Sequence, residues 1–184
     1  MGVGKTSFIH RYVAGSMPEE ASPNTIQPSL TTQRISHQGK RYILQLWDTG
    51  GHEKFRSATA SYCRDGHGVL IMYDITNPHS FASVRQWIYE VKNHALGPIV
   101  LSLIGNKSDL RSHRKITYKE AKLYSSKLGI SFYETSAKDS TNIEAAVLRL
   151  IDSIYELFGT ALMENGNNIN LNKRSCQCGS CMQG

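Results

Sequence analysis

Three apolar segments alternate with stretches of helical spacing in the second half of the chain. The apolar segments are VLIMYDI (69–75), IVLSLIG (99–105) and ISFYETS (130–136), and the helical stretches lie near 80–94, 117–128 and 142–158. Continuous runs of Val, Ile and Leu are typical of parallel strands that are buried on both faces. The alternation therefore predicts an α/β fold in which helices cover both faces of a mostly parallel sheet and ligands bind where the strands end.

The first half of the chain predicts a helix, a loop and a hairpin. Apolar residues at helical spacing predict a helix over 5–14, and three prolines among polar residues predict an exposed loop over 15–29. The segment QRISHQGKRYILQLW contains two short strands that flank Gln38-Gly39, which predicts a hairpin. A glycine-rich loop, DTGGHEKF, follows the second strand.

Length and charge narrow the class of protein. A length of 184 residues fits one domain, which we place at 1–159, followed by a polar, Asn-rich tail over 160–184 that we expect to be disordered. No apolar run approaches the ~18 residues of a membrane span. The N-terminus lacks a secretory pattern, so a reducing cytoplasmic setting is expected. We also expect a monomer. The net charge is +6, but the basic residues are scattered, which argues against a nucleic-acid partner.

The chain opens with the second half of a phosphate-binding loop, G-x-x-x-x-G-K-[ST]. The strand and the first glycine of that pattern are absent, since the glycine would fall before Met1. In such a loop, backbone N–H groups surround a phosphate, Lys5 reaches the terminal phosphates and the Thr6 hydroxyl ligates Mg²⁺. The alternative is a flexible turn that starts a helix. The expected phosphate-binding residues are Gly2, Val3, Gly4, Lys5, Thr6 and Ser7.

Asp48 follows the predicted strand YILQLW, at a strand end where a carboxylate can hold Mg²⁺ through water. The backbone N–H of Gly51 then lies where it can meet a γ-phosphate. The alternative for D-T-G-G is an Asx-turn that caps a helix.

Two further motifs follow strand ends and indicate a guanine base. In N-K-S-D (106–109) an Asp carboxylate can accept from the ring N–H and the exocyclic amine of guanine, a donor pair that adenine lacks. In S-A-K (136–138) a backbone N–H can meet the guanine oxygen. Each motif alone is more often a turn or a helix cap. The expected base-pocket residues are Asn106, Lys107, Asp109, Ser136, Ala137 and Lys138.

The four motifs occur together, in order, each at a strand-to-loop junction. Together they make this chain resemble a Ras-superfamily small GTPase from Gly2 to about Phe158. The specific resemblance to a Rab comes from two stretches, LQLWDTGGHEKFRSATASYCR and GVLIMYDITNPHSF. The resemblance implies a P-loop NTPase three-layer sandwich that binds GTP and GDP with Mg²⁺. It implies that Thr25 ligates Mg²⁺ and senses the γ-phosphate, and that the loops around Thr25 and 50–63 order in the GTP state.

The resemblance also implies partners. An exchange factor, an activating protein and effectors of Rab type are expected, and effectors would contact the trio Leu30, Trp47 and Tyr62. The competing interpretation of Trp47 and Tyr62 is that they are partly buried core aromatics.

The sequence departs from the Rab pattern in both loops. The loop after Thr25 is I-Q-P-S-L where Rabs have I-G-V-D-F, so known Rab effectors need not fit. His52 replaces the glutamine that orients the attacking water, and Gly50 adds backbone freedom beside it. One imidazole tautomer cannot present the donor and acceptor of an amide side by side, so we expect slow intrinsic hydrolysis. A neutral surface histidine with unimpaired hydrolysis is the alternative.

The first strand of the Rab fold lies in the middle of the sheet. Its absence leaves neighbouring backbone groups unpaired and removes buried side chains worth ~1.5–3 kcal/mol each. We therefore expect the chain as written to fold poorly or to bind nucleotide weakly and the functional protein to be longer; a short translated isoform is the alternative.

The tail carries Cys176, Cys178 and Cys181. The pair C-x-C resembles the prenylation signal of Rabs, which implies escort machinery and peripheral attachment to the cytosolic face of an endomembrane, although the last four residues match C-a-a-X poorly. Two lipid anchors would give stable binding. A metal site is the weaker alternative, because a fourth ligand is lacking.

These features predict a Rab-like switch in vesicle-mediated membrane trafficking and protein transport that hydrolyses GTP slowly. Two alternatives are a pseudo-GTPase scaffold that does not cycle and a non-functional fragment of a longer Rab. A third, an ATP-using kinase of the same fold, is opposed by Asp109.

Overall fold

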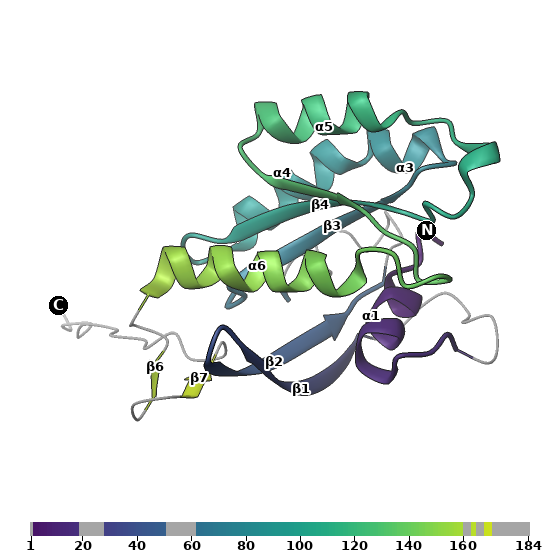
Figure 1. Ribbon diagram of the computed structural model, residues 1–184. Helices are drawn as coiled ribbons and strands as arrows, with labels where there is room; N and C mark the ends of the chain where they lie inside the picture. Colours follow the sequence, from purple (N-terminus) through teal and green to yellow (C-terminus); the bar gives the residue numbers. More distant parts are fainter. Residues whose placement is uncertain (1, 19–27, 51–61, 160–162, 165–167, 171–184) are drawn as a thin grey trace, which may run out of the picture.

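The structure is a computed structural model that describes residues 2–18, 28–50, 62–159, 163–164 and 168–170. Its strands form two sheets, and helices lie on both faces of the three-stranded parallel sheet (Figure 1). This α/β architecture confirms the predicted fold class. No helix within the described ranges is long and apolar enough to span a bilayer.

The second half of the chain forms a parallel sheet in the order β3-β4-β5. The strands are β3 (Gly68–Asp74), β4 (Val100–Asn106) and β5 (Ser131–Glu134). Alternate side chains enter the two hydrophobic clusters on opposite faces: Ile71 and Tyr73 face one cluster, whereas Leu70 and Met72 pack against the other. The strands are thus covered on both faces, as their continuous apolar sequences predicted.

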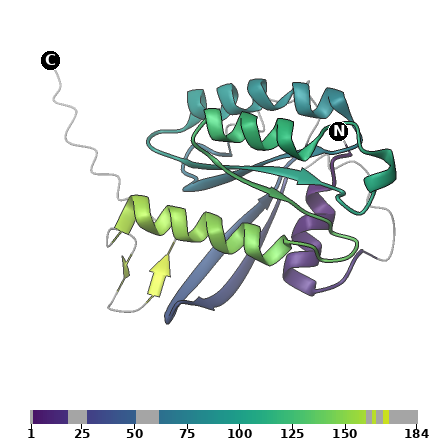
Figure 2. The ribbon, with the colours of Figure 1, turned by 45° about the horizontal axis from the view of Figure 1, so that its top comes forward.

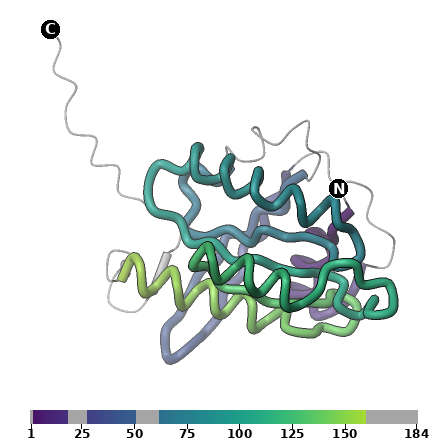
Figure 3. Tube along the Cα trace, turned by 90° about the horizontal axis from the view of Figure 1, so that it is seen from above, coloured from purple at the N-terminus to yellow at the C-terminus, as the bar shows by residue number. Residues whose placement is uncertain are grey.

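Helices of both halves of the chain build these clusters. They are α1 (Lys5–Ala14), α3 (Pro78–Ala82), α4 (Val84–His94), α5 (Tyr118–Lys127) and α6 (Ile143–Phe158). The 3₁₀ turn η2 (Arg111–His113) contributes no residue to either cluster. Apolar residues of α4 and α5 pack on one face of the parallel sheet, and those of α1 and α6 pack on the other. The long helices run along the direction of the strands (Figure 3).

The helix predicted near 80–94 is two helices that meet at Ser83. The first of them begins early because the Asn77 side chain accepts hydrogen bonds from the backbone N–H groups of His79 and Ser80, at 3.0 and 3.4 Å, and Pro78 occupies the first helical position. The cap and the proline therefore start the helix at Pro78, whereas the spacing of apolar residues predicted a start near 80.

The predicted hairpin is confirmed. Strands β1 (Ser29–His37) and β2 (Lys40–Asp48) pair antiparallel from Ser29↔Asp48 to His37↔Lys40. Gln38 and Gly39 both have positive φ, 50° and 73°, as a tight two-residue turn requires. The register places Leu30 directly opposite Trp47.

The two sheets are separate. Among the described residues, no strand pairs with the edge of β3 that faces away from β4, and β2 meets β3 through no ladder. Figure 1 and Figure 2 show the hairpin set apart from β3, β4 and β5, with α6 across the space between them. Within the described residues, the expected single sheet is therefore two half-sheets.

Part of the tail differs from the expected disorder. Two short strands, β6 (Met163–Glu164) and β7 (Asn168–Asn170), pair antiparallel with each other, and β7 adds in parallel to β2 at Arg41–Ile43. The backbone of β2 provides hydrogen-bond partners for β7, and the composition of the tail alone could not predict this pairing. The other tail residues lie outside the described ranges, so the expected disorder there stays a prediction.

Candidate functional site

The N-terminus of α1 meets the carboxyl ends of the strands. The side-chain amide of Asn106, the last residue of β4, donates to the carbonyl of Val3 at 2.8 Å. A Cβ atom on Gly4 would lie 2.5 Å from that amide nitrogen, and Gly4 has φ +89°. Only glycine fits here without displacing the buried Asn106. The loop before α1 is thus held against β4.

This loop leaves the first amides of α1 without helical partners. Gly4 caps the helix with no side-chain bond, and the first helical hydrogen bond runs from Phe8 N–H to the Gly4 carbonyl at 2.9 Å. The N–H groups of Lys5, Thr6 and Ser7 therefore lie at the positive end of the helix dipole, and the first turn contains no acidic residue. Such an end favours an anion such as phosphate.

Lys5 adds a cation to this end of the site. Burial lowers the pKa of its ammonium group, and the charge of Asp48 opposes that shift. A half-buried ammonium group gains from a bound anion that replaces the water it has lost. The placement suits contact with terminal phosphates.

Thr6 and Asp48 form the junction between α1 and β2. The Thr6 hydroxyl donates to Asp48 Oδ2 at 2.6 Å, and Asp48 is only 6% exposed. The other carboxylate oxygen, Oδ1, is buried and has no hydrogen-bond partner within the described part of the chain. A hydroxyl and an incompletely satisfied carboxylate are the hard oxygen donors that Mg²⁺ prefers, so these residues fit the ion.

Lys107, in the N-K-S-D motif predicted to bind the base, directly follows β4. Its backbone adopts φ +65°, and its ammonium group lies 2.7 Å from Asp74 Oδ2 at the end of β3. Burial raises the pKa of Asp74, but hydrogen bonds from Lys107 and Thr76 outweigh it and the net pKa is lowered. The ion pair fixes the stem of Lys107 over the strand ends.

Asn106 supports both parts of the site. Its amide nitrogen holds Val3, and its amide oxygen accepts from the Thr135 hydroxyl at 3.1 Å, ahead of S-A-K. The side chain is 1% exposed. The side chain therefore joins the loop before α1 to the residue that precedes S-A-K.

Asp109 and Ser136 bring the two base motifs together. The Ser136 hydroxyl donates to Asp109 Oδ1 at 2.7 Å and accepts from the Lys138 backbone N–H at 3.2 Å. Residues from N-K-S-D and S-A-K thus share one polar cluster, with Ala137 buried between its neighbours. The cluster positions a carboxylate and backbone amides at adjacent strand ends.

Sequence reasoning missed Arg11, which ties α1 to S-A-K. Its Nε atom donates to the Ala137 carbonyl at 2.7 Å, and its guanidinium also reaches the Lys138 carbonyl at 3.0 Å. Nothing in the helical spacing of 5–14 signalled this role. Asp74 was also missed. Like Asp48, it is the last residue of a strand, and that position was the signal that could have identified it.

The predicted trio forms one exposed apolar surface, which we call the hairpin patch. Leu30, Trp47 and Tyr62 are 45%, 45% and 44% exposed. Leu30 pairs with Trp47 across the strands, and the rings of Trp47 and Tyr62 lie 5.5 Å apart. These residues are surface neighbours rather than interior core.

Six predicted site residues lie outside the described residues. They are Thr25, Gly51, His52, Cys176, Cys178 and Cys181. Their roles stay predictions.

Comparisons with known proteins agree with the motif order. The sequence model of the Ras family matches residues 1–156. The chain is 41% identical over 167 residues to the Ras-related protein RABD2a of Arabidopsis thaliana, an alignment that spans 91% of this chain and 81% of that protein. It is 41% identical over 155 residues to the Ras-related protein rab-11.1 of Caenorhabditis elegans, spanning 84% and 73%. It is 39% identical over 166 residues to the GTP-binding protein ypt1 of Schizosaccharomyces pombe, spanning 90% and 81%.

The fold and the strand-end site define a nucleotide-binding protein of the P-loop class. The chain belongs to the Ras family of small GTPases and, within it, to the Rab proteins. Guanine nucleotide is the ligand of that family.

Proposed function

We propose that this chain is a GTP-dependent switch in vesicle-mediated membrane trafficking. The observation that carries the proposal is the Thr6–Asp48 junction at the positive end of α1, where one Asp48 oxygen has no hydrogen-bond partner among the described residues. Mg²⁺ bound there would neutralise phosphate charge and polarise the terminal phosphoryl group. Thr6 and Asp48 would hold the ion, while Lys5 and the amides of α1 would bind phosphate oxygens.

The base pocket supports guanine over adenine. The Ser136 hydroxyl fixes one Asp109 oxygen, so the carboxylate has a defined orientation toward a base at the strand ends. A carboxylate accepts from the two adjacent donors of guanine, whereas adenine presents no such pair. We propose that Asp109 selects guanine and that Lys107, fixed by Asp74, lies along the base.

Slow intrinsic hydrolysis is part of the proposal. His52 stands where Rabs have the water-orienting glutamine, and its ring presents donor and acceptor on opposite sides. An activating protein that supplies its own polar groups would restore part of the rate. The long-lived GTP state would favour effector binding at the hairpin patch, which is exposed and apolar.

Membrane attachment would come from the tail. Cys176, Cys178 and Cys181 are candidate prenylation sites, and two lipid chains give stable attachment where one does not. We propose attachment to the cytosolic face of an endomembrane after delivery by prenylation escort machinery.

A scaffold that binds partners without cycling is the second candidate, because the sheet is divided beside the phosphate loop. Trp47 fluorescence separates the two, since Trp47 adjoins Asp48 on β2. In a Trp87→Phe background, which leaves Trp47 as the indole probe, a switch predicts different emission with GDP and with a non-hydrolysable GTP analogue. Identical emission with both, under saturating nucleotide and Mg²⁺, would favour the scaffold. The Asp48→Asn variant is the matched control, in which the difference should shrink.

A further inference from the structure

The Arg11 guanidinium bonds three backbone carbonyls. Its Nε atom donates to Ala137 at 2.7 Å and its Nη2 atom donates to Lys138 at 3.0 Å, while Nη1 donates to Gly15 at 2.7 Å. Within the described ranges, no carboxylate forms an ion pair with this side chain. The cation is therefore directed at the main chain rather than at an opposite charge.

Only one of the three bonds is an ordinary helix cap. A basic residue in the last turn of a helix commonly bonds the last carbonyls, and Gly15 caps the C-terminus of α1. The other two bonds reach Ala137 and Lys138, which lie 126 and 127 positions away. Because Nε and Nη2 share one edge of the planar guanidinium, these two bonds attach the loop after β5 to α1 in a defined orientation.

The S-A-K loop is fixed on both sides of the Ala137 amide. Before this amide, the Ser136 hydroxyl donates to Asp109 Oδ1 at 2.7 Å. After it, Arg11 holds the carbonyls of Ala137 and Lys138. The Ala137 N–H itself has no hydrogen-bond partner in the described part of the chain, and the residue is only 6% exposed. A poorly exposed N–H of this kind points to an acceptor that a ligand supplies.

The direction of the loop carbonyls decides what the loop can bind. The oxygen of guanine is an acceptor, so a loop that recognises it must present N–H groups and turn its carbonyls away. Arg11 turns the carbonyls of Ala137 and Lys138 toward α1. Without these bonds the two peptide groups would be free to rotate, and a carbonyl that faced the guanine oxygen would repel it.

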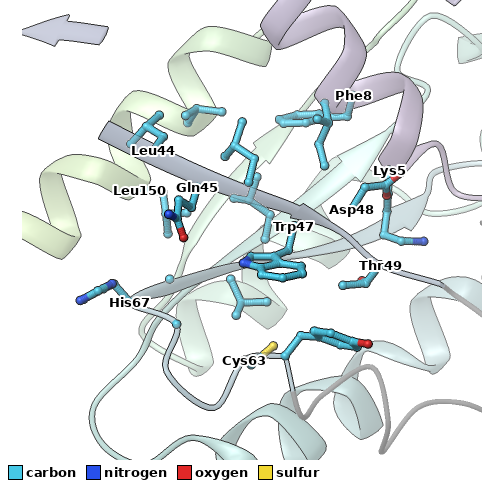
Figure 4. A pocket seen from close by; sticks show the side chains of 18 of the residues that line it. Lys5, Phe8, Leu44, Gln45, Trp47, Asp48, Thr49, Cys63, His67 and Leu150 are labelled. Carbon is cyan, nitrogen blue, oxygen red and sulfur yellow. The ribbon is translucent and has the colours of Figure 1, made fainter. Parts of the chain in front are cut away.

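The helix α1 connects this loop to the phosphate end of the site. Lys5 and Phe8 lie on the side of α1 that faces β2, as Figure 4 shows, whereas Arg11 extends to the loop after β5. Lys5 begins the helix and Arg11 lies in its last turn, a separation of about 9 Å along a helix axis. The proposed phosphate and base contacts therefore share one rigid element.

We propose that Arg11 is a positioning residue, which holds the S-A-K loop in the conformation that recognises the guanine oxygen and so slows the release of guanine nucleotide. Arg11 does not contact the base; it acts through the Ala137 amide. Its role rests on the proposed guanine pocket, and it gives α1 a means to control how long nucleotide stays bound.

The test compares the full chain with its Arg11→Met variant, which keeps an unbranched apolar stem and removes every N–H donor. Bound mant-GDP should dissociate roughly tenfold faster from Arg11→Met in Mg²⁺ when excess unlabelled GDP is added. Arg149→Met is the matched control, because Arg149 lies on α6 and its bond to Glu156, at 3.5 Å, is exposed. Its release rate should equal that of the wild type. Equal rates in wild type and Arg11→Met would overturn the proposal.

A second nucleotide separates positioning from a general loss of structure. In 6-thioguanosine diphosphate the base oxygen is replaced by sulfur, a weak acceptor, while both donors toward Asp109 remain. In competition against mant-GDP, Arg11→Met should lose roughly tenfold in GDP affinity but less than about threefold in affinity for the thio analogue. Equal losses for the two nucleotides would overturn the positioning role, because a merely loosened fold would weaken both alike.

Arg11→Lys keeps the charge but cannot form two parallel bonds along one edge. GDP release from this variant should be faster than from the wild type, again with a smaller loss for the thio analogue. Wild-type release from Arg11→Lys would overturn the two-carbonyl bridge. This variant also decides the question if Arg11→Met fails to fold.

Binding of GDP to the wild type is measured first, so that two kinds of failure differ. Absence of GDP binding to folded wild type would overturn the proposed nucleotide site and the role of Arg11 together. Tight binding to the wild type, with unchanged release from both Arg11 variants, would overturn the role of Arg11 alone.

Discussion

The hydroxyl of Thr6 donates a hydrogen bond to Asp48 Oδ2 at 2.6 Å, joining the first turn of α1 to the last residue of β2. The two residues lie 42 positions apart in the sequence. Their oxygens meet at the N-terminal turn of α1, and Asp48 Oδ1 is buried. This junction is the structural centre of the proposed magnesium and phosphate site.

Removing the Thr6 hydroxyl should weaken nucleotide retention. We expect GDP to dissociate roughly tenfold or more faster from Thr6→Ala in Mg²⁺, because the variant loses the proposed oxygen ligand and its bond to Asp48. Thr6→Ser keeps the hydroxyl and should retain near wild-type rates. Dissociation of a fluorescent GDP analogue measures this, and an equally fast Ser variant would show that the methyl group, not the hydroxyl, matters.

Base selectivity should change at Asp109. An amide in place of the carboxylate keeps the acceptor for the Ser136 hydroxyl but turns one acceptor into a donor. We expect Asp109→Asn to lose roughly 100-fold or more in GDP affinity and to gain affinity for xanthosine diphosphate, whose second ring carbonyl matches the new donor. Competition binding of both nucleotides checks this. An unchanged preference for GDP would mean that the guanine base does not bind at Asp109.

Asp74 should make stability sensitive to acid. Its folded-state pKa is lowered by hydrogen bonds from Lys107 and Thr76 that outweigh burial. A lowered folded pKa stabilises the native state above the unfolded value of about 3.9, and this contribution disappears as pH falls through the folded pKa. Urea unfolding of Asp74→Asn should therefore show lower stability at pH 7 and a shallower loss below about pH 4.

The control for that titration is Glu156→Gln, which removes a carboxylate from an ion pair whose Glu side chain is 65% exposed. Exposed pairs of this kind contribute little. Its pH profile should follow that of the wild type, and a slope change as large as that of Asp74→Asn would contradict the role of the buried pair.

Hydrolysis should accelerate when His52 is replaced by Gln. The amide presents donor and acceptor together, so it can orient the attacking water as the imidazole cannot. Single-turnover conversion of bound GTP measures the rate, with GTP affinity measured in parallel to separate chemistry from binding. Equal rates in the two proteins would remove His52 from the account of slow hydrolysis.

The hairpin offers a matched pair of leucines. Leu44 is 3% exposed and belongs to the core, whereas Leu30 is 45% exposed in the hairpin patch. Leu44→Ala should cost about 2–5 kcal/mol of unfolding free energy, and Leu30→Ala less than about 1 kcal/mol. Denaturant unfolding of both variants measures the two losses of unfolding free energy. Comparable losses would mean that the patch is packed in solution and not free for a partner.

Much of the fold was predictable because its signals are local. The strands 69–75 and 99–105 differ from β3 and β4 by one residue at each end, and the Gln38-Gly39 turn was readable from its residue types. The break at Ser83 was missed because the apolar spacing runs through both helices, while the Asn77 cap acts before the first apolar position.

The positions of candidate site residues were predictable where a motif follows a strand, as at Asp48 and Asp109. Arg11 was not, because its partners are backbone carbonyls 126 and 127 positions away, and any residue type can provide a carbonyl. The pairing of β7 with β2 escaped for a similar reason, since backbone edges rather than side chains create it. Long-range contacts to the main chain leave no trace in a single sequence.

The most direct test of the proposed nucleotide site is equilibrium binding of a fluorescent GDP analogue to the full chain, in Mg²⁺ and in EDTA. The expected result is saturable binding of one nucleotide per chain that weakens in EDTA and is displaced by unlabelled GDP or GTP but not by ATP. Absence of binding to folded chain in Mg²⁺, or equal displacement by ATP, would contradict it.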